Sequence, residues 1–202
     1  MPTIHFIEGP AGSGKSYYIG QQMAAQPGTS VAVSLSVSSF FQQPGLRAMP
    51  KGSDDILYGT LLDSSRYLMA LHQAIIGGFD HVYVDRFVIS QFVYGYIRRG
   101  ERSEPMKAFD ATILPTELRG IVHEGFNFAR YLNPRLLRYD LPEFALTFIV
   151  PDEQTVEYRR SIAERAFPFG MADYSYYSQI VDDPKLIASF NDRFCPTTVI
   201  RE

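Results

Sequence analysis

Residues 9–16 read Gly-Pro-Ala-Gly-Ser-Gly-Lys-Ser, which fits the pattern G-x-x-x-x-G-K-S of a phosphate-binding loop. Glycines let the backbone curl so that successive N–H groups can point at phosphate oxygens. The apolar residues 4–7 predict a buried strand before this phosphate loop, and residues 16–26 predict a helix after it. The positive N-terminal end of that helix would face the same phosphates. This strand–loop–helix context favours a nucleoside triphosphate site over a glycine-rich structural turn.

The side chains of the phosphate loop predict separate roles in binding ATP and Mg²⁺. Lys15 offers a positive charge to the β- and γ-phosphates, and the Ser16 hydroxyl is the usual Mg²⁺ ligand at this position. The residues expected to contact ATP are Gly9, Ala11, Gly12, Ser13, Gly14, Lys15, Ser16 and Tyr17.

Length and composition indicate one soluble globular domain over residues 1–202. The net charge of −3 gives no support to a broad nucleic-acid or membrane surface. The single cysteine, Cys195, excludes an intrachain disulfide. No apolar run reaches the roughly 18 residues that a membrane span needs, and no signal peptide precedes the first strand. We therefore expect a cytoplasmic protein that binds neither membrane nor nucleic acid, and we leave a homodimer open.

Apolar periodicity and turn residues predict alternating strands and helices along the chain. Strands are expected at residues 3–8, 30–35, 81–85, 145–150 and 197–200. Helices are expected at residues 16–25, 53–76, 90–98, 116–132, 152–160 and 184–191, with irregular segments at 38–51, 100–115 and 166–177. This alternation predicts an α/β fold with three layers, in which helices cover both faces of a mostly five-stranded parallel sheet.

Three further segments offer charged side chains for phosphate chemistry. Asp85 and Arg86 end the third predicted strand, where open α/β sheets place ligands, so Asp85 can hold Mg²⁺ and Arg86 can grip a second phosphate. A strand-end ion pair is the alternative. Arg66 lies within the long second helix, where a solvated helix flank is the alternative. A segment of about residues 153–172, with Arg159, Arg160 and Arg165, can form a lid over the phosphates, and an exposed charged helix is the alternative.

Several of these residues together resemble thymidylate kinases, whose close relatives are the deoxynucleoside kinases. The resemblance rests on Glu8-Gly9 before the loop, on the triplet Asp85-Arg86-Phe87 with Ser90 after it, and on residues 142–149 followed by Arg159. Residues 61–66 are similar in spacing to the thymidylate-kinase helix that carries a base-contacting arginine. The triplet is the more specific signal, since the phosphate loop is widely shared.

The resemblance implies a role for each matching residue. Lys15 and Ser16 would hold ATP and Mg²⁺, and Asp85 would position the metal together with Ser16. Catalytic residues would be Lys15, Asp85, Arg86, Arg159 and Arg165, the last two from the lid. The residues implied on the acceptor side are Arg66, Arg86, Leu62 and Ser90.

The sequence also departs from the family where the acceptor should bind. Ala11 stands where the family has a sugar-binding acid, and Leu62 stands where it has a stacking aromatic. Residues 34–41 carry no charge, although the family has Arg-Glu-Pro there. Packing is the favoured role of Phe126 and Tyr131, and both are also candidates to rebuild the pocket.

The resulting prediction is ATP-dependent phosphoryl transfer to a pyrimidine deoxynucleoside 5′-monophosphate, plain or modified. The alternatives are a deoxynucleoside kinase and a nucleotide-binding switch module that hydrolyses ATP without a small-molecule acceptor.

Overall fold

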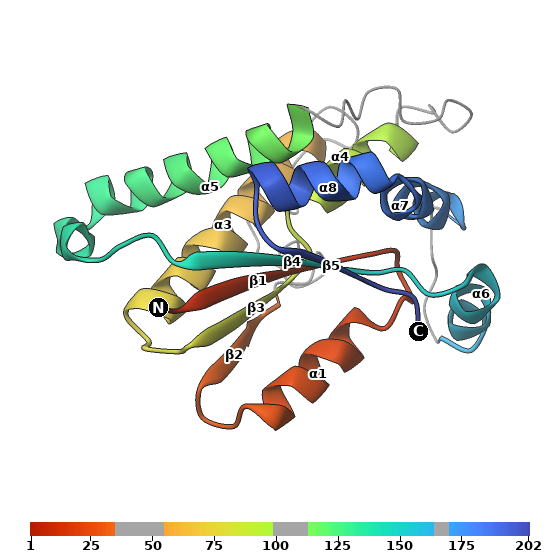
Figure 1. Ribbon diagram of the computed structural model, residues 1–202, viewed down its shortest axis with the longest axis horizontal. Helices are drawn as coiled ribbons and strands as arrows, with labels where there is room; N and C mark the ends of the chain where they lie inside the picture. The colour runs from red at the N-terminus through yellow and green to blue at the C-terminus, as the bar shows by residue number, and fades with distance from the viewer. Residues whose placement is uncertain (35–54, 99–112, 164–169) are drawn as a thin grey trace, which may run out of the picture.

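The computed structural model of the protein describes residues 1–34, 55–98, 113–163 and 170–202, leaving out the side chains of residues 55–63, 91 and 95–98. Within these residues, five parallel strands form one sheet in the order β2-β3-β1-β4-β5 (Figure 1). The strands are β1 (Thr3–Glu8), β2 (Ser30–Val33), β3 (His81–Asp85), β4 (Glu143–Ile149) and β5 (Thr197–Ile200). Ile7 of β1 lies opposite Asp85 of β3 and Thr147 of β4, so the carboxyl ends of the central strands meet at one edge.

Helices cover both faces of this sheet (Figure 1). α1 (Lys15–Ala25) packs on one face. The opposite face carries α3 (Asp55–Ile75), α4 (Val88–Arg98), α5 (Ile113–Leu132), α7 (Ala172–Asp182) and α8 (Pro184–Arg193). The 3-10 helix η1 (Pro134–Arg138) follows α5, and α6 (Glu153–Ser161) lies beyond the carboxyl ends of the strands. This arrangement is the predicted three-layer P-loop fold.

The alternation of side chains along β1 divides the core between the two faces. Phe6 points to the helix-rich face, where its ring stacks on Phe87 with centroids 4.3 Å apart. Ile7, the next residue, points to the α1 face and packs with Ile19. Both side chains are almost fully buried, so a slip of one residue in register would exchange the two cores.

Close contact between α3 and α5 depends on one small residue. A Cβ atom on Gly125 would lie 2.6 Å from the Tyr67 ring, so glycine is needed for this approach. The Tyr67 hydroxyl donates a hydrogen bond of 2.6 Å to the Val122 carbonyl. The paired hydroxyl and the apolar ring let tyrosine lie buried between the helices.

Most predicted elements are confirmed, and their ends differ by a few residues. The first, third and fifth strands have the predicted bounds, β2 ends at Val33, and α5 begins at Ile113. One prediction is wrong: residues 172–177 belong to α7 and are not irregular. The glycine at 170 precedes this helix, and Tyr176 and Tyr177 are buried in the core. The segments 38–51 and 100–112 lie outside the described residues.

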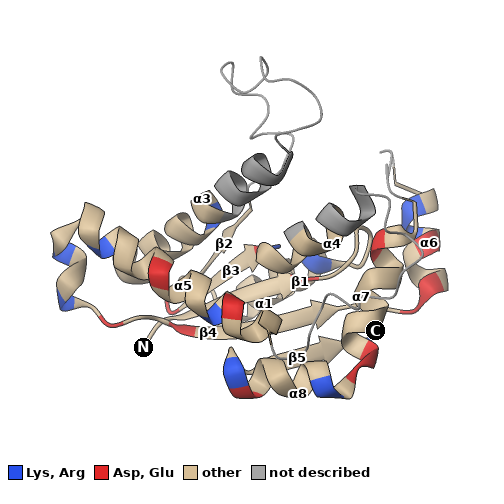
Figure 2. Cartoon of the chain, turned by 90° about the horizontal axis from the view of Figure 1, so that it is seen from above, with Lys and Arg blue, Asp and Glu red and all other residues tan. Residues whose placement is uncertain are grey.

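Charged residues of both signs are spread over the described helices α5, α6 and α8 (Figure 2). No helix in the described part of the chain is both long and apolar enough to cross a membrane.

Candidate nucleotide-binding site

The phosphate loop joins β1 to α1 at the carboxyl edge of the sheet, and its glycines have backbone angles that other residues rarely adopt. The φ angles are 149° at Gly9, 82° at Gly12 and 98° at Gly14. A Cβ atom on Gly9 would lie 2.2 Å from the Ile149 carbonyl oxygen. Glycine is therefore required for the loop to pass over the end of β4.

Lys15 is enclosed by this loop. Its side chain is buried, and Nζ donates hydrogen bonds to the Gly9 carbonyl at 2.9 Å and the Pro10 carbonyl at 2.7 Å. Nζ also lies 3.3 Å from Ser13 Oγ. Burial, together with the positive charge of Arg86, lowers the pKa of Lys15 to about 7. A phosphate anion beside the ammonium would favour the charged form and raise this pKa again.

We therefore expect nucleotide binding at about pH 8 to take up a proton. At that pH Lys15 is mostly neutral in the nucleotide-free protein, because its pKa is about 7. Below this pKa the lysine is protonated in both states, so uptake disappears; above it, affinity falls by up to about tenfold per pH unit. Titration calorimetry of a non-hydrolysable ATP analogue in two buffers of different ionisation enthalpy measures the uptake. Equal heats in both buffers at about pH 8 would contradict the assignment to Lys15, and Lys15→Met is the control.

Ser16 and Asp85 form a pair that fits Mg²⁺. Ser16 Oγ lies 3.3 Å from Asp85 Oδ2. Asp85 Oδ1 is buried and accepts no hydrogen bond from any described residue. Although the described residues hold no cluster of three His, Cys, Asp or Glu side chains, Mg²⁺ is commonly bound by one or two carboxylates together with phosphates and water. These two side chains can therefore hold the ion beside the phosphate loop.

Arg86 turns the chain sharply at the end of β3. Its φ angle of 70° lies in the left-handed region, which is uncommon for a residue with a side chain. The Arg86 N–H donates to the Ile7 carbonyl at 2.9 Å. The guanidinium lies against Tyr94, with Nη1 2.6 Å from the Tyr94 hydroxyl oxygen. The side chain is thus held on the same edge of the sheet as the phosphate loop.

The Glu8 carboxylate stabilises the turn after β3 through hydrogen bonds. Glu8 was not predicted as a site residue from the sequence. Its fully buried carboxylate accepts hydrogen bonds from the Phe87 N–H at 2.7 Å, the Ser90 hydroxyl at 2.6 Å and the Tyr177 hydroxyl at 2.8 Å. Burial raises the pKa of Glu8. A carboxyl group in a buried strand needs hydrogen-bond donors from elsewhere in the chain. The position of Glu8 at the end of an apolar strand could therefore have indicated a polar site at this edge of the sheet. The Ser90 hydroxyl is used here, and its implied contact with the acceptor stays a prediction.

Two arginines of α6, both predicted to belong to a lid, contact the phosphate loop. Arg159 Nη1 donates to the Ser13 carbonyl at 2.9 Å, and Arg160 Nε donates to the Ala11 carbonyl at 2.8 Å. Arg160 is 9% exposed, so the alternative of an exposed charged helix does not describe this arginine of α6. Arg165 lies outside the described residues.

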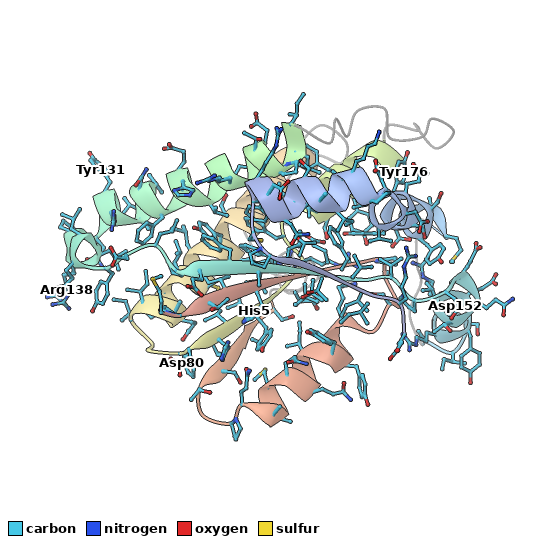
Figure 3. The ribbon with its side chains drawn as sticks, viewed as in Figure 1. His5, Asp80, Tyr131, Arg138, Asp152 and Tyr176 are labelled. Carbon is cyan, nitrogen blue, oxygen red and sulfur yellow. The ribbon has the colours of Figure 1, made fainter. Side chains whose placement is uncertain are left out.

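The other predicted site residues have varied surroundings. Arg66 is 5% exposed within α3, so the alternative of a solvated flank is wrong. Tyr17 is 72% exposed, and its hydroxyl accepts a hydrogen bond from Gln21. The Leu62 side chain lies outside the description. Phe126 is buried in the core, which confirms the packing role favoured for it, whereas Tyr131 is exposed at the end of α5, remote from the loop, so neither residue rebuilds an acceptor pocket there (Figure 3).

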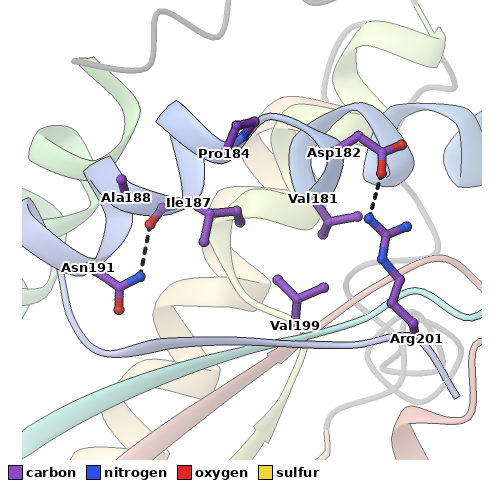
Figure 4. A pocket seen from close by; sticks show the side chains of 8 residues that line it. All are labelled: Val181, Asp182, Pro184, Ile187, Ala188, Asn191, Val199 and Arg201. Atoms are coloured by element: carbon purple, nitrogen blue, oxygen red, sulfur yellow. Dashed lines mark hydrogen bonds and ion pairs between the residues drawn. The ribbon is translucent and has the colours of Figure 1, made fainter.

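An open groove exists at another place, between α7, α8 and the edge strand β5 (Figure 4). Its lining includes Val181, Ile187 and Val199, with the ion pair of Asp182 and Arg201 at one end. None of its lining residues belongs to the phosphate loop or contacts Lys15, so the groove is separate from the candidate site.

Comparison with known proteins gives similarity at the level of shape. No protein family model matches the sequence, and no curated protein matches it. A solved structure of deoxyadenosine kinase from M. mycoides with the products dCMP and dCDP is similar at a TM-score of 0.48 and 14% identity, covering 98% of this chain and 89% of that one. The same enzyme with bound dATP gives a TM-score of 0.48 and 14% identity, covering 100% and 91%. Both similarities are below the level at which a fold match identifies a function.

Proposed function

We propose that the protein is an ATP-dependent phosphotransferase acting on a pyrimidine deoxynucleoside 5′-monophosphate. The observation that carries this proposal is the placing of Arg86 beside a complete phosphate loop. The loop accounts for ATP, and the neighbouring guanidinium accounts for a second anionic group at the same edge of the sheet. A guanidinium is suited to this role because its fork matches phosphate oxygens in pairs.

The residues of the site divide the transfer between them. Backbone N–H groups of the phosphate loop and Lys15 bind the β- and γ-phosphates, while Arg159, bonded to the Ser13 carbonyl, reaches the transferring group from the side of α6. Ser16 and Asp85 would hold Mg²⁺, which neutralises charge on the phosphate oxygens when it is bound. Arg86 orients the acceptor phosphate for in-line attack. Positioning and charge stabilisation of this kind supply most of the catalysis in phosphoryl transfer.

A deoxynucleoside kinase is the second candidate, and one observation favours it. An unphosphorylated acceptor must lose a hydroxyl proton to a base, whereas a phosphate acceptor is already an anion at neutral pH. Asp85 Oδ1 accepts no hydrogen bond from any described residue, so it is available to take that proton. In a deoxynucleoside kinase, Asp85 would serve as the general base, and Arg86 would stabilise the negative charge on the phosphoryl group during transfer.

An ADP-release assay over deoxynucleosides, their 5′-monophosphates and 5-substituted pyrimidine monophosphates tests the proposal. We expect the highest kcat/KM with a pyrimidine monophosphate. Strong turnover of an unphosphorylated nucleoside would instead identify a nucleoside kinase. ATP binding without turnover of any acceptor would favour the switch module.

A further inference from the structure

Ala11 of the phosphate loop has both of its backbone polar groups bound by side chains from outside the loop, so the two consecutive peptide groups on either side of its Cα are fixed. The Ala11 N–H donates to Asp173 Oδ2 at 2.9 Å, and Arg160 Nε donates to the Ala11 carbonyl at 2.8 Å. The two side chains are joined to each other by an ion pair of 2.8 Å between Arg160 Nη2 and Asp173 Oδ1. Ala11, Arg160 and Asp173 thus close a ring between the loop, α6 and α7.

This ring is buried and well satisfied. Asp173 is 2% exposed and Arg160 is 9% exposed. Asp173 Oδ1 also accepts from the Tyr174 N–H at 2.9 Å, and Arg160 Nη1 donates to the Gly170 carbonyl. A buried ion pair is weak evidence for stability, because desolvation offsets much of the attraction. The Arg160–Asp173 ion pair instead acts on the geometry of the phosphate loop.

The backbone geometry of the loop matters because a carbonyl oxygen that pointed into the loop would repel the phosphate oxygens that bind there. Lys15 binds the carbonyls of Gly9 and Pro10. The next carbonyl, that of Ala11, is committed to Arg160 and cannot turn toward a bound anion. Gly12 follows with a φ angle of 82°, and a Cβ atom there would lie 3.1 Å from Arg160 Cγ. The arginine therefore packs directly against the loop at Gly12.

We propose that Arg160 and Asp173 are positioning residues that clamp the backbone on both sides of Ala11 and hold the phosphate loop in the conformation that binds nucleotide. This inference rests on the proposed binding of ATP, but it concerns residues that need not touch ATP. It changes the role expected for Arg160, from a lid arginine to a fixed support, and it leaves Arg159, bonded to the Ser13 carbonyl, as the arginine proposed to reach the transferring phosphoryl group.

The test is the affinity of each folded variant for Mg²⁺ and AMP-PNP, a non-hydrolysable ATP analogue, by titration calorimetry well below the melting temperature. Asp173→Asn has the same shape but loses the charge that holds Arg160. We expect its affinity for AMP-PNP to fall about 10- to 100-fold, the usual effect of breaking a buried hydrogen bond to a charged group. The matched control is Asp182→Asn, on the same helix but in an exposed ion pair with Arg201, which should bind AMP-PNP like wild type.

The possible outcomes separate the two proposals. If wild type fails to bind AMP-PNP, the proposed function is wrong, whatever the clamp does. If wild type binds and folded Asp173→Asn binds equally well with only a lower melting temperature, the pair is merely structural and the clamp is overturned. If Asp173→Asn does not fold, Arg160→Lys decides: it keeps a charge for Asp173 but cannot also reach the Ala11 carbonyl, so unchanged affinity would overturn the clamp.

Discussion

Lys15→Ala is expected to lower phosphoryl transfer at least about 10²- to 10³-fold, the usual cost of removing one charge-stabilising donor from an active site. Nζ already lies within the loop, bonded to two of its carbonyls, so phosphate oxygens entering the loop would meet the ammonium directly. Loss of the charge should slow transfer more than it weakens ATP binding, because charge on the phosphoryl oxygens is redistributed in the transition state. The ADP-release assay gives the rate, and AMP-PNP titration gives the affinity.

The structure changes what should be expected of this variant's stability. The sequence suggests a surface-loop lysine, whose loss would leave the fold intact, but Lys15 is only 6% exposed. Its pKa of about 7 lies below that of an unfolded lysine, so between about pH 7 and 10 the unfolded chain binds more protons and Lys15 makes wild-type stability rise with pH. Lys15→Met, which keeps the aliphatic length, should lose that rise. Unchanged turnover in folded Lys15→Met would refute the site.

The parts of the fold that were predicted from sequence depend on local patterns. The phosphate loop, the apolar strand before it and the strand ending at Asp85 can each be recognised within a few residues. Alternation of strands and helices then leads to a parallel sheet. The presence of Ser16 and Asp85 at one edge follows from this topology, and the structure places their oxygens 3.3 Å apart.

The parts that were missed depend on contacts between distant segments. Glu8 and Tyr177 are 169 residues apart, and Ala11 and Asp173 are 162 apart. Nothing in the local sequence around Asp173 distinguishes it from a surface acid at a helix start. The same holds for Tyr176 and Tyr177 of α7, whose burial becomes evident only when the helix is packed on α4. Because residues 166–177 also contain a proline and a glycine, their local sequence is typical of an irregular segment.

Arg86→Lys is expected to raise the KM for the acceptor about 10- to 100-fold while the affinity for AMP-PNP changes little. A charge-assisted hydrogen bond contributes about 1.5–3 kcal/mol, and lysine keeps the charge but loses the planar fork. The Arg86 guanidinium is directed by its bond of 2.6 Å to the Tyr94 hydroxyl, and its Cζ lies 5.1 Å from the centre of that ring. A lysine amine could not keep this contact and bind a phosphate with two parallel bonds.

A second substitution separates the guanidinium from the backbone turn. Arg86→Gly removes the whole side chain. Glycine adopts the φ angle of 70° without strain, so this substitution should not destabilise the turn itself. If acceptor binding depends on the guanidinium, Arg86→Gly should raise the acceptor KM at least as much as Arg86→Lys. Arg201→Lys, in an exposed ion pair remote from the loop, serves as the matched control. A larger loss of AMP-PNP affinity than of acceptor affinity in Arg86→Lys would assign Arg86 to the ATP side, because the fork would then be gripping a phosphate of ATP.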